Sequence, residues 1–294
     1  MKIGLLVAGI GRGARPATLR ILAEHCERLN FGTIWAPEHI VLFDQQDSKY
    51  PYSEDGRFAT SSTSDWMDPF VALSYIAARS ERIRLATGIC LVPEHNPLEL
   101  AKVVASVDRV SGGRFALGVG IGWSAEEFAA LGIGFERRNQ RTREYLEVMR
   151  RLWSEERTDF DGEFVKFKGV RSYPKPVQAK MPIIFGGESG SALKRVAECG
   201  TGWFGFNLAP DEAGIKIKRL RELMRERGRA PSEVELIISP YTKHVTAADL
   251  RGYHEAGVSE VVMTMQVAEN EAEIPAQLEQ CARDWVAPAA TLGG

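Results

Sequence analysis

The chain has 294 residues and carries 37 Lys and Arg against 39 Asp and Glu, so its formal net charge is −2 at pH 7. This near balance gives no electrostatic argument for binding nucleic acid or a membrane. The apolar and charged fractions, 44% and 26%, are those of a soluble globular protein, and the length is normal for one α/β barrel.

The cysteines, the N-terminus and the apolar runs predict a cytoplasmic protein with no resident metal. The four cysteines form no C-x-x-C pair and show no metal-ligand spacing, so we expect buried thiols in a reducing compartment. A strand pattern begins at Lys2, without the basic and apolar regions of a signal peptide. No apolar run approaches the ~18 residues that a bilayer span needs.

In chain order, eight short apolar runs are each followed by a helix-period pattern, which indicates alternating strands and helices. The predicted strands are Ile3–Val7, Thr33–Trp35, Ile83–Ile89, Phe115–Val119, Pro182–Phe185, Gly202–Phe206, Val234–Ser239 and Glu260–Met265. This alternation requires a parallel sheet covered by helices, and eight units fit one closed (β/α)8 TIM barrel. In that fold the chemistry lies at the C-terminal ends of the strands.

Caps and periodicity predict several of the intervening helices and leave two irregular segments. Helices are expected from about Pro16, over Asp68–Ser80, from Asn96 to Ser111, and over Asn139–Trp153, Asp211–Arg227 and Glu271–Trp285. Residues 123–138 have no regular pattern. The insertion at about 154–181, before the fifth strand, contains an alternating stretch around Gly162 that predicts a small hairpin. We expect a single domain over residues 1–294.

Residues 41–66 are polar and lack periodicity, and a loop of this length in a compact domain is usually a lid or binding loop. Its place after the second strand puts it over the active face. Its aromatic residues, among them Tyr50, Tyr52 and Phe58, argue against a disordered linker. We therefore expect these side chains to face the substrate.

Two glycine patterns at strand ends suggest ligand binding. Gly120 and Gly122 would let the backbone approach a flat ligand, although a tight turn explains them almost equally well. Gly186 and Gly187 precede Glu188 and Ser189 and a predicted helix, so unpaired N–H groups there could bind a phosphate; plain capping by Ser189 is the alternative.

A third pattern, Gly9-x-Gly11-x-x-Ala14 after the first strand, has the form of a dinucleotide fingerprint. Glu38, the acid that would bind the ribose, lies well beyond the usual ~20-residue spacing. Eight strand-helix units also exceed the six strands of a doubly wound dehydrogenase fold. We therefore favour the barrel.

His39 at the end of the second strand is the candidate proton donor or acceptor, with simple packing as the equal alternative. Glu38 could orient its ring, act as a base or pair with a loop arginine. His95 and His244 also follow strands, but no spacing supports a metal. Trp35 and Trp123 could flank a planar ring or pack at the rim.

Residues Ser111–Trp123, followed by Glu126, Glu127 and Phe128, resemble the signature of the luciferase-like monooxygenase superfamily. Matching segments follow in the expected order at Phe135, Arg138, 174–178, 182–187 and 202–203. The motifs 37–39, 50–53 and 55–57 are similar to those of a branch that is usually assigned to the deazaflavin coenzyme F420. The match covers about Trp35 to Trp203, and the last third matches only by fold.

The resemblance implies where a cofactor would bind. The ring would lie over the end of the third strand, with a non-prolyl cis peptide at Gly88–Ile89 forming a bulge behind it. Gly186 and Gly187 match the phosphate site, together with the neighbouring Glu188 and Ser189. Gly120, Gly122 and Asn96 are expected near the cofactor, and His39 matches the histidine of the second strand.

Two departures from the family pattern limit this transfer. Related deazaflavin enzymes often carry Ser-Asp-His where this chain has Pro37-Glu38-His39, which weakens the transfer of a detailed acid–base mechanism. They often carry Gly-Asp-Gly-Trp where this chain has Gly200-Thr201-Gly202-Trp203, which removes a carboxylate.

The leading hypothesis is hydride transfer between coenzyme F420 and a small organic substrate. The second is an FMN-dependent monooxygenase supplied by a separate flavin reductase. A barrel that binds a flavin or deazaflavin without catalysis is the alternative from another class. A groove containing Arg12, Arg15 and Arg57 would favour the polyglutamate tail of F420. The resemblance also implies a homodimer.

Overall fold

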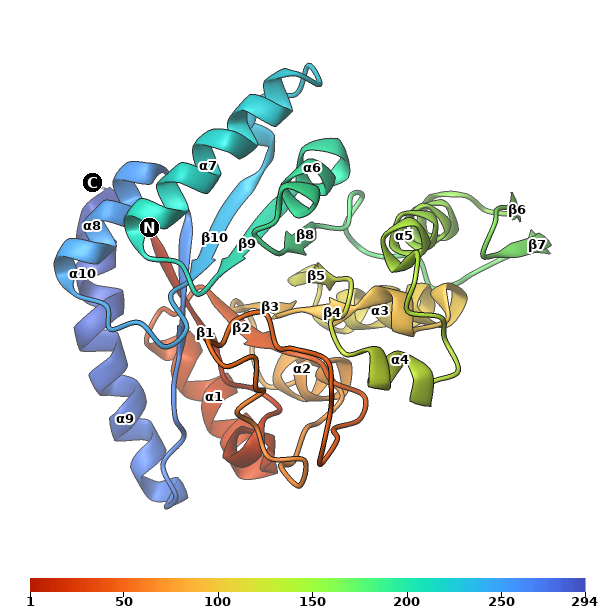
Figure 1. Cartoon of the computed structure of the whole chain (residues 1–294). Helices are drawn as coiled ribbons and strands as arrows, with labels where there is room; N and C mark the ends of the chain where they lie inside the picture. The colour runs from red at the N-terminus through yellow and green to blue at the C-terminus, as the bar shows by residue number, and fades with distance from the viewer. Residues whose placement is uncertain (294) are drawn as a thin grey trace.

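The computed structural model describes residues 1–293 and shows a closed parallel barrel surrounded by helices (Figure 1). The barrel strands are β1 (Lys2–Leu6), β2 (Thr33–Ala36), β3 (Arg84–Thr87), β5 (Phe115–Gly120), β8 (Ile183–Gly186), β9 (Gly202–Phe206), β10 (Glu235–Ser239) and β11 (Glu260–Thr264). Each pairs in parallel with its neighbours, and the pairing of β3 with β5 closes the ring. The predicted TIM barrel is therefore confirmed.

The glycines after β1 belong to a turn in this barrel, so the dinucleotide-fold alternative is wrong. Gly9 and Gly11 have φ values of 86° and 49°, which explains why glycine occupies them. A side chain on Gly13 would overlap the carbonyl oxygen of Val7, so this turn packs tightly against β1.

The third strand is interrupted, which contradicts the prediction of one strand over Ile83–Ile89. β3 ends at Thr87, the peptide between Gly88 and Ile89 is cis, and β4 (Cys90–Leu91) continues the pairing with β5. The N–H of Gly88 still donates to the carbonyl oxygen of Ala36 at the end of β2, at 2.7 Å. Apolar character was continuous across this break, so periodicity did not reveal it.

Ten α-helices are described within residues 1–293, and most of them form the outer layer of the barrel (Figure 1). They are α1 (Pro16–Arg28), α2 (Pro69–Ala77), α3 (Pro97–Val110), α4 (Ala125–Ala130), α5 (Arg138–Ser154), α6 (Gly190–Cys199), α7 (Pro210–Arg225), α8 (Ala247–Ala256), α9 (Ile274–Cys281) and α10 (Ala287–Ala290). None is long and apolar enough to cross a bilayer, among the residues described.

Two segments differ from the predicted helices. The segment 123–138, expected to be irregular, contains α4, whose N-cap Ser124 accepts a hydrogen bond from the backbone N–H of Glu127. The last predicted helix is broken into a 3₁₀ turn at Glu271–Glu273, α9, a π turn at Ala282–Val286 and α10. The predicted hairpin is confirmed as β6 (Thr158–Asp161) paired with β7 (Lys166–Val170), and it projects away from the barrel (Figure 1).

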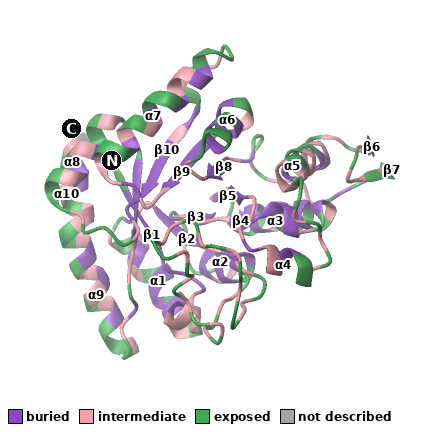
Figure 2. Ribbon diagram, viewed as in Figure 1, coloured by how far each residue is buried: buried purple, intermediate pink, exposed green. Residues whose placement is uncertain are grey.

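The core has two parts, and buried residues follow the strands and the inner faces of the helices (Figure 2). A large apolar cluster fills the space between sheet and helices, and a smaller one fills the barrel interior. Trp35 belongs to the interior cluster, where its ring centroid lies 4.8 Å from that of Phe204. It is fully buried, so it does not flank a ligand as one interpretation of the sequence suggested.

Candidate functional site

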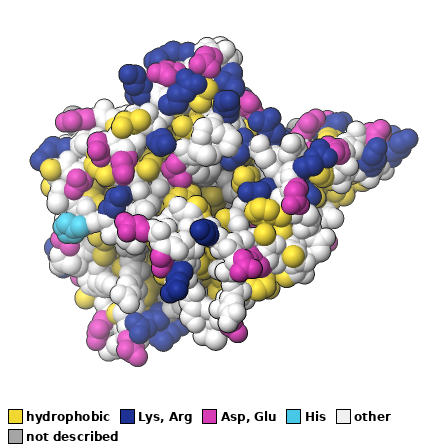
Figure 3. All heavy atoms as spheres, in the orientation of Figure 1, with side chains coloured by type: hydrophobic (Ala, Val, Ile, Leu, Met, Phe, Trp, Pro, Cys, Tyr) yellow, Lys and Arg dark blue, Asp and Glu magenta, His cyan; other side chains and the backbone are white. Residues whose placement is uncertain are grey.

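A cavity of about 640 Å³ opens at the C-terminal ends of the barrel strands. Hydrophobic side chains occupy the hollow at the centre of the face in Figure 3. Most of the predicted site residues line this cavity, and they are Glu38, His39, Tyr50, Tyr52, Phe58, Gly88, Ile89, Gly120, Gly122, Trp123, Gly186, Gly187, Glu188 and Ser189. Residues from seven separate strand ends and the lid segment thus meet in one place, as the barrel topology requires.

Asn96 is the predicted residue that does not line this cavity. It is exposed at the N-cap of α3, where its side-chain oxygen accepts a hydrogen bond from the backbone N–H of Leu98 at 2.9 Å. A cap side chain engaged in this way is turned toward its own helix. The structure therefore does not bring Asn96 together with the other candidates.

His39 is oriented by Glu127, a residue that the sequence analysis did not assign to the site. The Nδ1 atom of His39 lies 2.8 Å from the Oε2 atom of Glu127. The other carboxylate oxygen accepts hydrogen bonds from the backbone N–H groups of Ile40, at 2.6 Å, and Val41, at 3.2 Å. Glu127 is buried, so this anchor is protected from solvent competition. It leaves Nε2 as the ring nitrogen available for proton transfer.

Three aromatic rings surround the imidazole of His39. Their centroids lie 5.0 Å away for Phe58, 5.1 Å for Trp66 and 5.8 Å for Trp123. The side chain of His39 is consequently only 8% exposed. A proton on this ring would exchange with a bound ligand more readily than with bulk water.

Glu38 does not orient His39, although it was predicted as a partner for that ring. Its Oε2 atom accepts a hydrogen bond from the backbone N–H of Leu91 at 2.5 Å, and its Oε1 atom lies 3.1 Å from Nε2 of His95. Adjacent side chains on an extended segment point in opposite directions, which separates Glu38 from His39. Burial lowers the pKa of His95 and the neighbouring carboxylate of Glu38 raises it, and the net direction is upward.

A second unassigned acid, Glu94, lies behind the glycine-rich end of β5. A side chain at Gly122 would come within 2.7 Å of its Oε1 atom, and φ at Gly122 is 76°. Burial, followed by the charges of Glu127 and Glu38, raises the pKa of Glu94 to about 9. Without a bound cation this carboxyl group would carry a proton at neutral pH.

The lid segment 41–66 closes one side of the cavity with packed aromatic rings. The Tyr50 centroid lies 4.9 Å from that of Phe58 and 5.5 Å from that of Tyr52, and Tyr52 lies 4.8 Å from Phe206 on β9. Burial raises the pKa of both tyrosines above the usual range, so both keep their hydroxyl protons.

Two consecutive acids on helix α4 hold the start of the lid segment by accepting hydrogen bonds from its backbone. The Oε1 atom of Glu126 accepts hydrogen bonds from the backbone N–H groups of Asp47, at 2.7 Å, and Ser48, at 3.0 Å. Its neighbour Glu127 holds Ile40 and His39. One short helix therefore positions both the start of the lid and the candidate acid–base residue.

The cis bond at Gly88–Ile89 directs Ile89 into a groove formed by glycines. A side chain on Gly120 would come within 2.8 Å of Ile89 Cδ1, and one on Gly186 would overlap the same atom. These two glycines therefore admit the Ile89 side chain at the cavity floor. The Ile89 side chain makes this part of the cavity wall apolar.

The other end of the cavity carries positive charge, from two arginines that the sequence analysis did not assign to the site. Arg195 on α6 is 4% exposed, donates to Oδ1 of Asn139 at 3.1 Å, and has no hydrogen-bond partner at Nε within the described chain. Arg138 on α5 also lines the cavity and donates from Nε to the carbonyl oxygen of Gly122 at 3.2 Å. A buried guanidinium with an unpaired N–H is suited to an anionic ligand.

The N-terminus of α6 faces the same end of the cavity. Ser189 caps the helix by accepting a hydrogen bond from the backbone N–H of Ala192 at 3.2 Å, which matches the capping alternative, and its Oγ also lies 2.9 Å from Oγ of Ser191. Glu188 has a different partner, since its Oε1 atom accepts from the backbone N–H of Phe206 at 2.7 Å. Burial raises the pKa of Glu188 against the opposing effect of that bond.

The chain forms a closed barrel, its cavity lies at the strand ends, and a cis peptide follows the third strand. These features place it among the TIM barrels that are built like enzymes. The family model described as luciferase-like monooxygenase matches residues 5–287, and the chain belongs to this family. Family membership supports enzymatic activity on small molecules, as an oxidoreductase or monooxygenase.

Several known proteins are similar to this chain. The uncharacterized protein Rv0953c of Mycobacterium tuberculosis is 35% identical over 270 residues, which cover 90% of this chain and 92% of that protein. The pyrimidine monooxygenase RutA of Methylorubrum extorquens is 30% identical over 209 residues, covering 67% and 55% respectively.

Solved structures confirm the fold. An F420-dependent secondary alcohol dehydrogenase, in complex with an F420-acetone adduct, superposes with a TM-score of 0.75 at 17% identity and covers 98% of each chain. The monooxygenase RslO1 from Streptomyces bottropensis gives 0.74 at 21% identity and covers 98% of this chain and 99% of its own. At these identities the likeness shows the fold alone.

Proposed function

We propose that this protein transfers a hydride between coenzyme F420 and a small organic substrate. The observation that carries the proposal is one cavity that combines an apolar wall at Ile89, a positively charged end at Arg195, and His39 between aromatic rings. A ring, a phosphate and a proton-transfer group each have a matching position there. A cofactor with a planar ring and a phosphate fits these residues.

The two ends of the cavity suit a cofactor that carries a planar ring and a phosphate. Ile89, seated in the groove of Gly120 and Gly186, would support one face of the ring. Arg195, Arg138 and the N-terminus of α6 would bind the phosphate, because a buried guanidinium and unpaired helix N–H groups favour an anion.

When bound, the deazaflavin supplies two-electron hydride chemistry and scarcely reacts with oxygen. The protein would hold the substrate beneath Tyr50 and Phe58 and exclude water from the reacting atoms. His39 would donate or accept the accompanying proton at Nε2, while Glu127 holds Nδ1. In this scheme Glu38 shapes the cavity wall and does not exchange the proton.

The decisive experiment is a fluorescence titration of the purified protein with F420 and, in parallel, with FMN. Submicromolar binding of F420 alone is the expected result, and reduced F420 should then be consumed with unsaturated carbonyl compounds. Arg195→Met should weaken binding of either cofactor, whereas Arg157→Met on the distant hairpin should not. Absence of binding to both cofactors would refute the proposal.

A second candidate is an FMN-dependent monooxygenase that receives reduced flavin from a partner reductase. Its support is the 30% identity to a relative named as a pyrimidine monooxygenase. Preference for FMN, with oxygen consumption in the presence of a reductase, would establish this alternative. Binding without any turnover in either assay would indicate the non-catalytic barrel. The predicted homodimer is to be checked in the same preparations by light scattering.

A further inference from the structure

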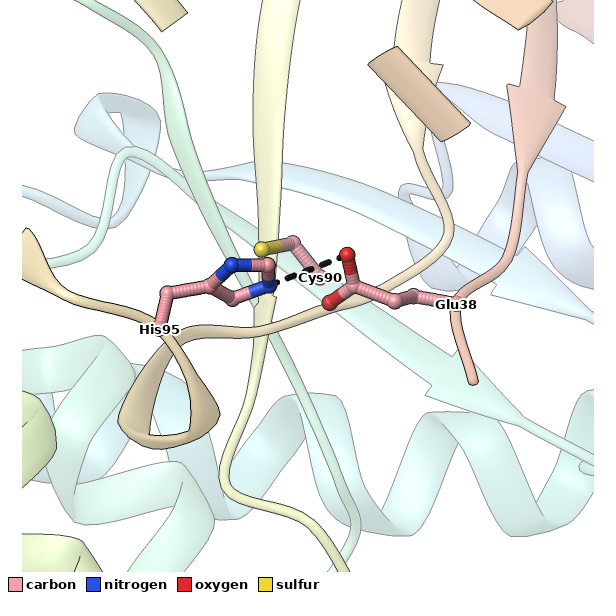
Figure 4. A group of neighbouring side chains, drawn as sticks. All are labelled: Glu38, Cys90 and His95. Carbon is pink, nitrogen blue, oxygen red and sulfur yellow. Dashed lines mark ion pairs between the residues drawn. The ribbon is translucent and has the colours of Figure 1, made fainter. Parts of the chain in front are cut away.

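We propose that Glu38, Cys90 and His95 form a binding site for a transition-metal ion of the Zn²⁺ class. The three side chains come from the end of β2, the start of β4 and the residue after the 3₁₀ turn Val92–Glu94. One ligand atom of each lies within 4.8 Å of the others, and the three side chains converge in Figure 4. This inference does not depend on the identity of the redox cofactor.

Within residues 1–293, two of the three side chains in this cluster make no hydrogen bond to the backbone, and the third, Glu38, accepts one from the N–H of Leu91. His95 Nε2 is buried and lies 3.1 Å from Glu38 Oε1, but the described chain offers it no aligned hydrogen-bond partner. Cys90 is a fully buried free thiol. A metal bound here would displace the thiol proton and replace the contact between His95 and Glu38, because cysteine and histidine bind metals in their deprotonated forms.

Glu94, next to His95 in the chain, is a further buried acid beside the cluster. Glu94 is 5% exposed, and neither of its carboxylate oxygens has a hydrogen-bond partner within the described chain. Buried polar atoms in proteins are normally hydrogen-bonded or bound to a metal, so the unpartnered oxygens of Glu94 could supply a fourth ligand.

The donor set points to zinc rather than magnesium or calcium. Thiolate and imidazole ligands select Zn²⁺ and its neighbours, whereas Mg²⁺ and Ca²⁺ require oxygen ligands. Bonds of roughly 2.0–2.3 Å in a tetrahedron place the ligand atoms about 3.3–3.7 Å apart, so small side-chain rotations would adjust the present separations, which are all within 4.8 Å. Glu94 or a water molecule would complete a tetrahedron.

A metal at this position would act on the structure behind the cavity. It would join the segment that leads to His39 to the residues that follow the cis bond at Gly88–Ile89. A metal ion that binds the folded state and not the unfolded state would also raise the free energy of unfolding. The competing explanation is a metal-free cluster in which the thiol shares its proton with the carboxylate of Glu38.

The test is a titration of the chelator-treated full-length protein with Co²⁺ and Zn²⁺. We expect one equivalent of Co²⁺ to bind with a thiolate-to-cobalt charge-transfer band, and Zn²⁺ to displace it. Cys90→Ser should abolish the band and weaken the affinity at least tenfold. The matched control is Cys199→Ser, which changes a partly exposed thiol elsewhere and should leave both intact.

His95→Gln is the second variant, in case Cys90→Ser does not fold. It should keep the charge-transfer band while weakening the affinity, and the rise in Tm on adding Zn²⁺ should be smaller than in the unmodified protein. Absence of stoichiometric binding to the unmodified protein would overturn the proposal. A band that survives Cys90→Ser would overturn it as well. Neither result affects the titration with F420 and FMN.

Discussion

The imidazole of His39 is held at one nitrogen and faces the cavity with the other. Because Nδ1 contacts Glu127 at 2.8 Å and other residues form the proposed phosphate site, removing the ring should affect turnover more than cofactor binding. We expect His39→Ala to lower turnover about 10²- to 10⁴-fold while the Kd of the cofactor changes less than about threefold. Turnover and fluorescence titration check this. Unchanged turnover would remove His39 from the mechanism.

Glu127 determines which nitrogen of His39 carries the proton, so its replacement should alter the pH dependence. In Glu127→Gln an amide N–H₂ facing Nδ1 would favour the tautomer with the proton on Nε2. Loss of a charged hydrogen bond predicts a fall in kcat of about ten- to hundredfold, together with a displaced pH profile of kcat.

Glu126→Gln is the matched control, because Glu126 holds backbone N–H groups of the lid and makes no contact with His39. It should leave the shape of the pH profile unchanged. Identical profiles for Glu127→Gln and the unmodified protein would show that Glu127 is only a structural anchor.

The interrupted third strand depends on glycines in its neighbour β5. Thr87 Oγ1 donates to the carbonyl oxygen of Gly118 at 2.8 Å and accepts from its N–H at 2.9 Å. A side chain on Gly118 would overlap the carbonyl oxygen of Thr87, which belongs to the backbone and cannot rotate away.

Gly118→Ala should therefore lower the free energy of unfolding by about 3 kcal/mol or more. Gly190→Ala, in which the added carbon meets nothing within 4 Å, is the control and should be nearly neutral. Urea denaturation measures both. Equal stability of the two variants would mean that β3 and β5 can separate without cost.

Prediction from the sequence missed helical elements that are too short to show a helical period. Helix α4 has six residues, too few for a helical period to be recognised, yet it supplies both Glu126 and Glu127. The signal that was present is the pair of acids in the first turn after Ser124, a favoured N-cap. The longer α5 was predicted to within one residue at each end.

Stability of the whole barrel should depend on pH through Glu260, which is fully buried at the start of β11. Burial raises its pKa to about 7 from an ordinary value of 4.5, although Arg84 and Thr33 oppose this and Glu235 adds to it. Between these two pKa values the folded state keeps a proton on Glu260 that the unfolded state has released. The contribution of Glu260 to the free energy of unfolding is therefore fully present below about pH 4.5 and is lost as the pH rises through about 7.

Glu260→Gln removes this titration while keeping an oxygen for the hydroxyl of Thr33, which now donates to Glu260 Oε2 at 3.1 Å. Relative to the unmodified protein, the variant should gain up to about 3 kcal/mol of unfolding free energy between pH 4.5 and pH 8, at 1.36 kcal/mol per unit of pKa. Urea unfolding at several pH values measures the difference. Parallel stability curves would contradict the assignment.

Local patterns along the chain were enough to indicate the barrel, the hairpin, the lid segment and the strand ends at which Gly120, Gly186 and His39 lie. Period, caps and glycine placement are properties of neighbouring residues. The pairing of His39 with Glu127, 88 positions away, and the meeting of Glu38 with Cys90 and His95, were decided only by the tertiary structure. Closing the sheet sets which strand ends face one another and which way each side chain turns, and no local period carries that information.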